Sequence, residues 1–410
     1  MKLSLFTPTH DPRFLGQTWQ SLKTQDADFE WVIVPNGVGL REDHLRQLQN
    51  LASQDRRIKV PLFPGLPDGV GALKRAACQA CQGDAFVELD HDDMLTPGAL
   101  GRINAAFEGG AGFVYSDSAA FSTTNEGTRV IPRTYTPRNG WQTYSLTAYG
   151  HSFTATKAFD LTPRSLCEVH YAPDHVRAWS RRAYELVGGH DASLEVADDH
   201  DLICRTYLSG ADFTHTNGCD YLYRWHDRNT VQSKNQKIQS LQKDNRDRYV
   251  AALSAEWSRR HGYALMRING VDELTDVLGL SDEKDDRVGQ IVIEKALQYL
   301  TPETYVDALT RLHDLLAPGG FLHVSVPDPE GLWADQDQFH RLRFNANSFL
   351  HLGDPEFRGV LPVSDRVKFE TVGVRSYYPS PAFEAKKMSA LWFDLCALKG
   401  QNHPGPAHAW

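Results

Sequence analysis

The sequence lacks any apolar run of the roughly 18 to 20 residues that a membrane-spanning helix needs. Residues 1–8 are too few, and too soon interrupted by proline, for a secretory signal. Cysteine is scarce, with six residues at scattered positions, which indicates a reducing compartment instead of a disulfide framework. Cys78 and Cys81 have no second pair at zinc-ribbon spacing, so we interpret them as helix-packing residues. We therefore expect a cytoplasmic protein without a membrane span.

Positive charge is also in deficit, since 43 Lys and Arg face 52 Asp and Glu and leave a net charge of −9. This balance argues against non-specific nucleic-acid binding by the whole molecule, although it is compatible with a local basic surface. The 41% of hydrophobic and 23% of charged residues are ordinary for a soluble globular protein. A chain of 410 residues is long enough for two domains and admits a third.

Short apolar runs alternate with helical patterns along the first half of the chain. This alternation predicts an α/β fold with a doubly wound, mostly parallel sheet. Residues 118–180 are less regular. The strands are expected at residues 2–7, 30–34, 58–60, 86–89 and 112–117, and the helices at 13–24, 41–53, near 71–81, at 181–187 and from about 198.

The apolar strand within residues 86–93 runs directly into three carboxylates. Buried carboxylates are costly unless a positive charge lies between them, and oxygen ligands suit Mg²⁺ or Mn²⁺. We interpret Asp90 and Asp92 as the two ends of an Asp-X-Asp metal motif at a strand end, where open α/β sheets bind ligands. The alternative, strongest for Asp93, is an acidic turn before a helix that has Thr96 as its N-cap, followed by proline.

A second acidic cluster, with Asp198, Asp199 and Asp201, opens a later helix. Acidic residues in a first turn are favourable against the helix dipole, which is the plain structural interpretation. Three aspartates within four positions exceed what capping needs. We therefore expect a functional role for at least one of them.

The chain changes character near residues 261–262, and a second α/β pattern follows. We expect a domain at residues 1–230, a connecting helix at 231–262 and a second domain at 263–410, whose last ten residues form a loose tail. Residues 224–260 carry nine Lys and Arg against four Asp and Glu, which fits a solvated helix face or an anion- or acceptor-binding surface. The second domain is expected to contain strands at 287–294 and 321–326 and a helix at 308–316.

Six short segments of the first 230 residues resemble, in order and spacing, the family 2 glycosyltransferases, which have the GT-A fold. Each segment alone is weak evidence for the family, whereas six segments in the right order and spacing are strong evidence. A further segment, outside these six, departs from the family pattern. Asn36 stands where these enzymes usually carry the first Asp of Asp-Asp-Gly-Ser. An asparagine side chain can hydrogen-bond to a base or a ribose but cannot ionise, so this position does not determine the identity of the nucleotide base. The matching segments are residues 6–9, 19–25, 71–76, 88–93, 197–202 and 223–230.

The resemblance implies an inverting, metal-dependent transfer of a sugar from a nucleotide-sugar to an acceptor hydroxyl. UDP is the nucleotide expected by default, and the acceptor is expected to be a glycan or a lipid-linked glycan. Asp199 would be the general base with Asp198 beside it, and Asp117 would close over donor or acceptor. The implied ligands of Mn²⁺ or Mg²⁺ are Asp90, Asp92 and His226, and the implied donor contacts are Thr7, Pro8, Thr9, Asn36, Lys74, Asp90 and Arg224.

Residues 312–328 resemble the later half of a class I methyltransferase, with a helix, a Pro-Gly-Gly turn and a strand. The cofactor site of such enzymes is a Gly-X-Gly loop, where only glycine lets the backbone approach the ligand. Residues 262–290 contain no Gly-X-Gly. We therefore expect a shortened methyltransferase-like domain that binds no S-adenosylmethionine and is the likelier surface for a homo-oligomer.

Four other functions compete with this interpretation. A glycoside hydrolase also needs two carboxylates, but it has no use for an Asp-X-Asp metal motif. A non-catalytic nucleotide-sugar-binding or scaffold protein would fit the altered Asn36 loop, and the intact Asp199 motif opposes it. A methyltransferase would bind S-adenosylmethionine. A phage-type enzyme that glycosylates modified nucleic-acid bases would look similar in sequence, although nucleic acid is not the favoured acceptor.

Overall fold

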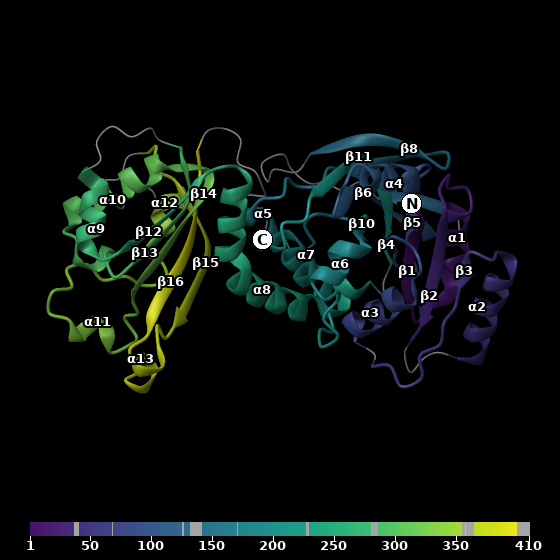
Figure 1. Ribbon diagram of the computed structural model, residues 1–410, viewed down its shortest axis with the longest axis horizontal. Coiled ribbons are helices and arrows are strands. Elements are labelled where there is room, and N and C mark those ends of the chain that lie inside the picture. The colour runs from purple at the N-terminus through teal and green to yellow at the C-terminus, as the bar shows by residue number, and fades with distance from the viewer. Residues whose placement is uncertain are drawn as a thin grey trace. The chain divides into compact units, whose positions relative to one another are not determined.

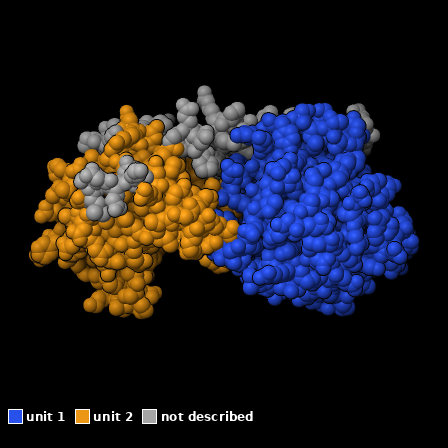
Figure 2. Space-filling model, turned by 45° about the horizontal axis from the view of Figure 1, so that its top comes forward, with its two compact units in different colours: residues 1–161, 169–245, 406–410 blue, residues 162–168, 246–405 orange. Residues whose placement is uncertain are grey.

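The computed structural model describes the chain except residues 37–40, 68, 125–126, 132–141, 170, 227–228, 280–285, 355–356, 358–364 and 400–410. Two compact units divide it (Figure 2). Unit 1 contains residues 1–161 and 169–245, and unit 2 contains residues 162–168 and 246–405. The expected C-terminal tail lies outside the described residues, so its structure stays a prediction.

Unit 1 is built on one mixed sheet, in which β3, β2, β1 and β4 are neighbouring parallel strands (Figure 1). Strand β10 is antiparallel to both β4 and β6, and β11 runs parallel to β6. The strands are β1 (Leu3–Thr9), β2 (Phe29–Pro35), β3 (Ile58–Lys59), β4 (Ala85–Glu88), β5 (Met94–Leu95), β6 (Phe113–Thr124), β7 (Gly127–Ile131), β8 (Thr143–Ala148), β9 (His151–Thr156), β10 (Arg177–Ser180) and β11 (Phe213–Arg224).

The helices of unit 1 follow the expected alternation with the strands. Strands β1 and β2 are buried along nearly their whole length, as expected for strands covered on both faces. The helices are a 3₁₀ turn (Pro12–Phe14), α1 (Leu15–Leu22), α2 (Glu42–Gln54), α3 (Val70–Ala80), α4 (Ala99–Glu108), α6 (Arg181–Leu186) and α7 (Asp198–Leu208). Cys78 and Cys81 are buried free thiols at the end of α3, in line with helix packing.

Two local expectations for unit 1 are corrected. The residues expected to be irregular contain the end of β6, all of β7 to β10 and α5 (Pro163–Glu168), because Thr- and aromatic-rich stretches pair there as antiparallel hairpins. Helix α4 does not begin at Pro97. Gly98 occupies the N-cap position with φ of 76°, and the Thr96 hydroxyl instead donates to the carbonyl of Cys219 at 2.8 Å.

Unit 2 has a five-stranded sheet in the order β12, β13, β14, β16, β15, in which β16 runs opposite to the other four strands. Figure 1 shows α9 and α10 on one side of this sheet. The strands are β12 (Ala264–Asn269), β13 (Val288–Glu294), β14 (Leu316–Pro327), β15 (Phe369–Tyr377) and β16 (Ala390–Ala397). The helices, besides α5, are α9 (Val271–Gly279), a 3₁₀ turn (Leu297–Tyr299), α10 (Pro302–Leu315), α11 (Trp333–Gln336), α12 (Leu350–Gly353) and α13 (Pro381–Ala385).

Helix α8 (Thr230–Arg260) contains the division between the units, between residues 245 and 246. The sequence predicts a connecting helix there. The first half of α8 is bonded to unit 1 and the second half to unit 2. The Asn245 amide lies 3.3 Å from Nδ1 of His200 in unit 1, whereas Gln290 of β13 donates to Ser254 at 2.8 Å in unit 2. Among the described residues, the chain has no helix that is long and apolar enough to cross a membrane.

Candidate active site

The carboxyl ends of β1, β2 and β4 meet at one edge of the unit 1 sheet. Thr9 is in register with Pro35, and Phe6 is in register with Glu88. The Asn36 backbone N–H donates to the carbonyl of Thr9 at 2.8 Å. Open α/β sheets bind ligands at this edge. The structure therefore brings the expected nucleotide loop, the Asn36 loop and the Asp-X-Asp turn to one place.

The nucleotide-loop residues offer backbone rather than side chains. The Thr7 hydroxyl is fully buried, donates to the Leu89 carbonyl at 2.6 Å and accepts from the Trp31 indole at 2.8 Å. The Thr9 hydroxyl donates to the carbonyl of Asp11 at 3.2 Å. Pro8 lies between them and is partly exposed. Asn36 differs, because its buried Oδ1 has no hydrogen-bond partner among the described residues, which exclude the adjacent residues 37–40.

The Asp-X-Asp turn joins the loop after β11. Oδ2 of Asp92 lies 2.7 Å from Nε2 of His226, and the His226 ring stacks on Phe14 at 5.7 Å. Burial alone would raise the pKa of Asp92, but the contact with His226 outweighs it and holds this pKa below its usual range. Burial, reinforced by Glu88 and Asp92, raises the pKa of Asp90 to about 7.

Asp93 has a structural role, although not the helix-capping role that was the alternative for it. Its carboxylate is buried and accepts the backbone N–H of Arg224 at 2.6 Å. Burial and the adjacent charges of Asp92 and Asp90 raise its pKa well above the usual range. Asp93 therefore fastens the turn to β11.

The fit of a divalent cation can be judged from these donors. No group of three or more His, Cys, Asp or Glu side chains that could hold a metal is found among the described residues, so Asp90 does not complete a cage with Asp92 and His226. Mg²⁺ is commonly bound through one or two carboxylates together with substrate phosphates. The adjacent carboxylate and imidazole of Asp92 and His226 fit that kind of site.

Arg224 lies behind the turn. Its side chain is fully buried, with the guanidinium 4.3 Å from the Phe14 ring centroid and 4.4 Å from that of Phe121. It donates to the backbone carbonyl of Asp92 and to the hydroxyl of Thr123. Burial lowers its pKa to about 10, so it is still charged at neutral pH. The structure thus places this cation within the protein, in support of the Asp92 backbone.

Lys74 of α3 is likewise held inside unit 1. Its ammonium lies 2.8 Å from Oε1 of Glu88 and 3.5 Å from Oδ2 of Asp198, and only 7% of the residue is exposed. Burial would lower its pKa, but Asp198 and Glu88 outweigh burial and raise it well above the usual value. Lys74 therefore stays charged and neutralises two buried carboxylates.

The two aspartates at the start of α7 differ in access. The Asp198 side chain is 2% exposed and lies 2.8 Å from Nδ1 of His190. The Asp199 side chain is 19% exposed, accepts the N–H of His200 at 2.8 Å and forms an ion pair with Arg177. Burial would raise the pKa of Asp199, but Arg177 and then Lys74 hold it far below its usual range. Of the pair, Asp199 is the carboxylate that reaches solvent in its ionised form.

Sequence reasoning missed the residues that complete this network. Arg177 of β10 bridges Asp199 and Glu88, with its Nη1 3.5 Å from Oε1 of Glu88. Glu88 thereby ties α7 to the strand that leads into the Asp-X-Asp turn. A charge count would have been the only signal, because the carboxylates 88, 198 and 199 exceed the single cation Lys74 predicted near them.

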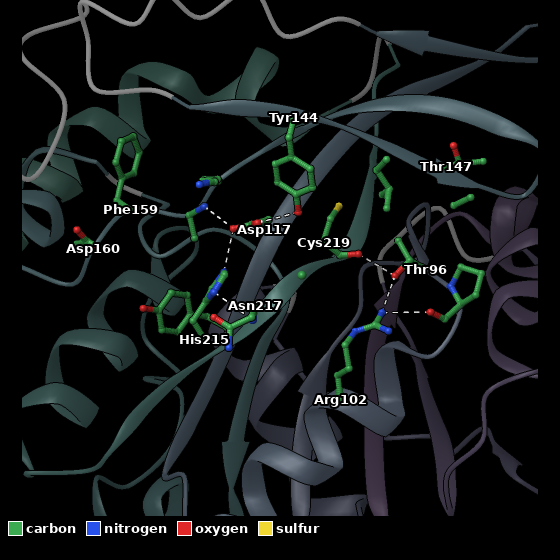
Figure 3. Close-up of a pocket in the computed structure, with 17 residues that line it drawn as sticks. Thr96, Arg102, Asp117, Tyr144, Thr147, Phe159, Asp160, His215, Asn217 and Cys219 are labelled. Atoms are coloured by element: carbon green, nitrogen blue, oxygen red, sulfur yellow. Dashed lines mark hydrogen bonds and ion pairs between the residues drawn. The ribbon is translucent and has the colours of Figure 1, made fainter.

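Asp117, expected to close over donor or acceptor, is 4% exposed and bonded on both oxygens. It accepts from Tyr144 and from the N–H of Ala158, each at 2.8 Å, and lies 2.8 Å from Nε2 of His215. These contacts belong to a separate cavity in unit 1, drawn in Figure 3.

Comparisons with known proteins agree with this arrangement. The model of the family described as Glycosyl transferase family 2 matches residues 4–170. The O-antigen biosynthesis protein RfbC of Myxococcus xanthus is 28% identical over 207 residues, which is 50% of this chain. The chain spans 14% of the length of that curated relative.

Solved structures with a related chain trace include S. aureus TarS 1–349 and the mannosyltransferase PcManGT of Pyrobaculum calidifontis. The TarS fragment is 15% identical with a TM-score of 0.43, covering 77% of this chain and 80% of its own. PcManGT is 12% identical with a TM-score of 0.38, and the match covers 63% of this chain and 64% of PcManGT. Both TM-scores are below 0.5, so the assignment depends on the family match and the sheet edge described above. Within this chain, residues 4–170 match the model of glycosyl transferase family 2.

Proposed function

We propose that this chain transfers a sugar from a nucleotide-sugar to an acceptor hydroxyl, with inversion at the sugar carbon. The proposal is supported by the match of residues 4–170 to the model of glycosyl transferase family 2. The observation that carries it is the bridge made by Arg177, which contacts both Asp199 and Glu88. This bridge connects an ionised, solvent-reaching carboxylate with the strand that leads to the Asp92 and His226 pair.

For the donor, we propose that the nucleoside lies against the backbone of residues 7–9 and the side chain of Asn36. The unpartnered Oδ1 of Asn36 supports this assignment, because a ligand N–H or hydroxyl would satisfy a buried acceptor. A uracil base is the family's usual one and is our choice among the bases. Lys74 and Arg224 contribute by fixing Glu88 and the Asp92 backbone, rather than by touching the diphosphate.

Asp92 and His226 are the residues proposed to hold Mn²⁺ or Mg²⁺, with Asp90 beside them. Such a cation supplies Lewis-acid neutralisation of the charge that develops on a leaving diphosphate. Arg224 and Asp93 keep the turn in place from behind, so the Asp92 carboxylate needs little rearrangement.

For the acceptor, we propose that Asp199 accepts the proton of the attacking hydroxyl. Arg177 stabilises its ionised form, so Asp199 is unprotonated throughout the neutral pH range. The same ion pair weakens it as a base, so proton transfer requires the Arg177 contact to loosen as the acceptor approaches. The hydroxyl attacks the sugar carbon as the bond to the diphosphate breaks, and one displacement inverts that carbon. The name of the relative RfbC, an O-antigen biosynthesis protein, supports a glycan or lipid-linked glycan as the acceptor.

For unit 2, we propose a shortened methyltransferase-like module. The support is its sheet order, in which three parallel strands are followed by β16, an antiparallel strand placed between β14 and β15. The absence of Gly-X-Gly in residues 262–290 supports a module that does not use S-adenosylmethionine.

Calorimetric titration of the full chain with UDP, GDP, TDP and S-adenosylmethionine, with and without Mn²⁺, tests these proposals. We expect metal-dependent binding of UDP that is lost in Asp92→Ala. Absence of binding by every nucleotide would refute the transferase, and binding of S-adenosylmethionine alone would move the function to unit 2.

A further inference from the structure

Unit 1 contains a cavity of about 840 Å³ that the transfer reaction proposed above does not use. This volume lies within the range of small-ligand sites, roughly 300 to 1,000 Å³. It is open to solvent and is lined by residues of β6, β8 and β11, by the residues before α4 and by the segment that follows β9 (Figure 3). None of its lining residues is among those assigned to the donor, the cation or the base.

The cavity lies on the opposite face of β6 from the catalytic network. Successive side chains of a strand point to opposite faces. The Ser118 hydroxyl donates to Asp174, near Arg177, so Ser118 faces the network. Tyr115 and Asp117, displaced by odd numbers of residues along the same strand, line the cavity. A ligand in the cavity would therefore not occupy the transfer site.

The backbone of β11 is distorted where it borders the cavity. Two steps along β6, from Tyr115 to Asp117, are matched by four along β11, from His215 to Cys219. The two extra residues form a bulge in which Asn217 has a φ of 58°, a left-handed conformation that is uncommon outside glycine. Such bulges re-aim side chains beside functional sites. Here the bulge brings Asn217 to the cavity wall.

Asp117 fixes three walls of the cavity in one arrangement. It bonds Tyr144 of β8, His215 of β11 and the N–H of Ala158, each at 2.8 Å (Figure 3). Both of its oxygens are thereby occupied, so Asp117 is not a free anion for a cationic ligand. The walls are held in place before any ligand arrives, which lowers the entropic cost of binding.

The polar groups left for a ligand are mainly neutral. The Tyr115 and Thr147 hydroxyls line the cavity, and no hydrogen bond from these two side chains to the rest of the described chain is found. The Asn217 amide also lines the cavity and is hydrogen-bonded to His215. The rings of Tyr115, Tyr144 and Phe159 supply flat apolar surface. Hydroxyl and amide groups beside aromatic rings match a pyranose, which has hydroxyls at its rim and apolar C–H faces.

The charges of the lining oppose a phosphate ligand. Two cations, Arg102 and Lys157, are balanced by the carboxylates Asp117 and Asp160. The Arg102 guanidinium is already paired with Asp220 at 2.6 Å. The cavity therefore has no surplus of positive charge with which to bind a nucleotide.

We propose that this cavity binds a neutral saccharide unit of the glycan acceptor, away from the hydroxyl that receives the sugar. The proposal rests on the transferase function for the identity of the glycan, and it adds a site that anchors the chain while its end reaches Asp199. A glycan held at two points has a higher effective concentration at the transfer site.

Saturation-transfer NMR on the full chain tests the site, with methyl glycosides of glucose, galactose, mannose, rhamnose and N-acetylglucosamine as probes. We expect at least one glycoside to bind, and its affinity to fall about tenfold or more in Tyr115→Phe/Asn217→Gly. Glycine tolerates the left-handed backbone and keeps the backbone N–H that donates to Nδ1 of His215 at 3.1 Å, and phenylalanine keeps the ring, so His215 stays held and the walls are preserved. Tyr378→Phe, at an exposed tyrosine of unit 2, is the matched control and should bind as the wild type does.

The competing outcomes are separable. No glycoside signal, an unchanged signal in the double variant, or displacement by UDP would overturn the proposed saccharide site. UDP binding by calorimetry must persist in the double variant, because its residues lie outside the donor site. Glycoside binding without any nucleotide binding would support the saccharide site and refute the transferase.

Discussion

Oδ2 of Asp92 and Nε2 of His226 lie 2.7 Å apart, although 134 residues separate them in sequence. The contact joins the turn after β4 to the loop after β11. Because both groups are also the proposed ligands of one cation, they should act as a unit and not as two independent sites.

We predict that Asp92→Asn and His226→Ala each lower the transfer rate by about 100- to 1,000-fold, as removal of a transition-state stabilising group does. The double variant should be little worse than either single one, since each change already disables the pair. His261→Ala in unit 2 is the control. Losses that multiply fully in the double variant would contradict a shared role.

Substitution of Asp199 should have a different effect on activity and stability from substitution of Asp198. We predict that Asp199→Asn lowers kcat by about 100- to 10,000-fold with unchanged UDP affinity, because it removes the proton acceptor and none of the proposed donor contacts. The pKa of Asp199 is held below its usual range. The pH–rate profile of the wild type should therefore show no loss of activity from protonation of this group above about pH 4. An acidic limb near neutrality that disappears in Asp199→Asn would argue against this assignment.

Asp198→Asn tests the contrast. Asp198 is buried against His190 and Lys74, so its replacement should destabilise unit 1 as well as lower activity. If Asp198→Asn folds normally and lowers only kcat, Asp198 would be the general base and Asp199 would have the structural role.

Lys74 is predicted to be a stabilising cation. Lys74→Met leaves Glu88 and Asp198 buried without their neutralising charge, and loss of one partner of a buried pair costs about 3 to 5 kcal/mol. Alkylation of the buried Cys204 of α7 in increasing urea measures the stability of unit 1. Lys23→Met, an exposed change, is the control.

A second change distinguishes charge from packing at this position. Adding Glu88→Gln to Lys74→Met removes one of the two unpaired carboxylates, and part of the lost stability should return. If the double variant is less stable than Lys74→Met by the full effect of Glu88→Gln, then the ammonium and the carboxylate do not interact energetically.

The sequence predicts the frame of unit 1 because local patterns set it. The apolar runs of β1 and β2 and the helical stripes of α1 and α2 lie where the residues indicate them, and the Asp-X-Asp turn follows β4. The hairpins after Asp117 were missed because their residues pair with β6 and with each other, and such pairing is set by tertiary contacts.

The side-chain network of the site was less predictable. Nothing near Arg177 in sequence indicates that it bridges Glu88 and Asp199, because the bridge requires β10 to insert antiparallel beside β4. Lys74 and Arg224 were expected to face a diphosphate, and the structure buries both. A sequence motif gives residue types at an edge of the sheet, whereas packing decides which of them face inward.

Unit 2 contains a buried pair of carboxylates with an unusual pH response. Nε of Arg164 lies 3.3 Å from Oε2 of Glu168, and Arg164 is also ion-paired with Glu370. Burial, reinforced by Glu370, raises the pKa of Glu168 to about 8. Between its ordinary value of 4.5 and 8, the folded state binds more protons than the unfolded state. The free energy of unfolding should therefore fall as the pH rises through this window.

We predict that the stability of unit 2 decreases by up to about 1.4 kcal/mol per pH unit in that window through this group. Glu168→Gln keeps the shape and cannot ionise, so its stability should be flatter with pH and should exceed that of the wild type near pH 8. Alkylation of the buried Cys396 of β16 in urea reports on unit 2. Glu185→Gln, at a glutamate whose side chain is 61% exposed in unit 1, is the control and should keep the wild-type dependence. A Glu168→Gln variant that retains the full pH dependence would mean that Glu168 is ionised in the folded protein, with Arg164 outweighing burial.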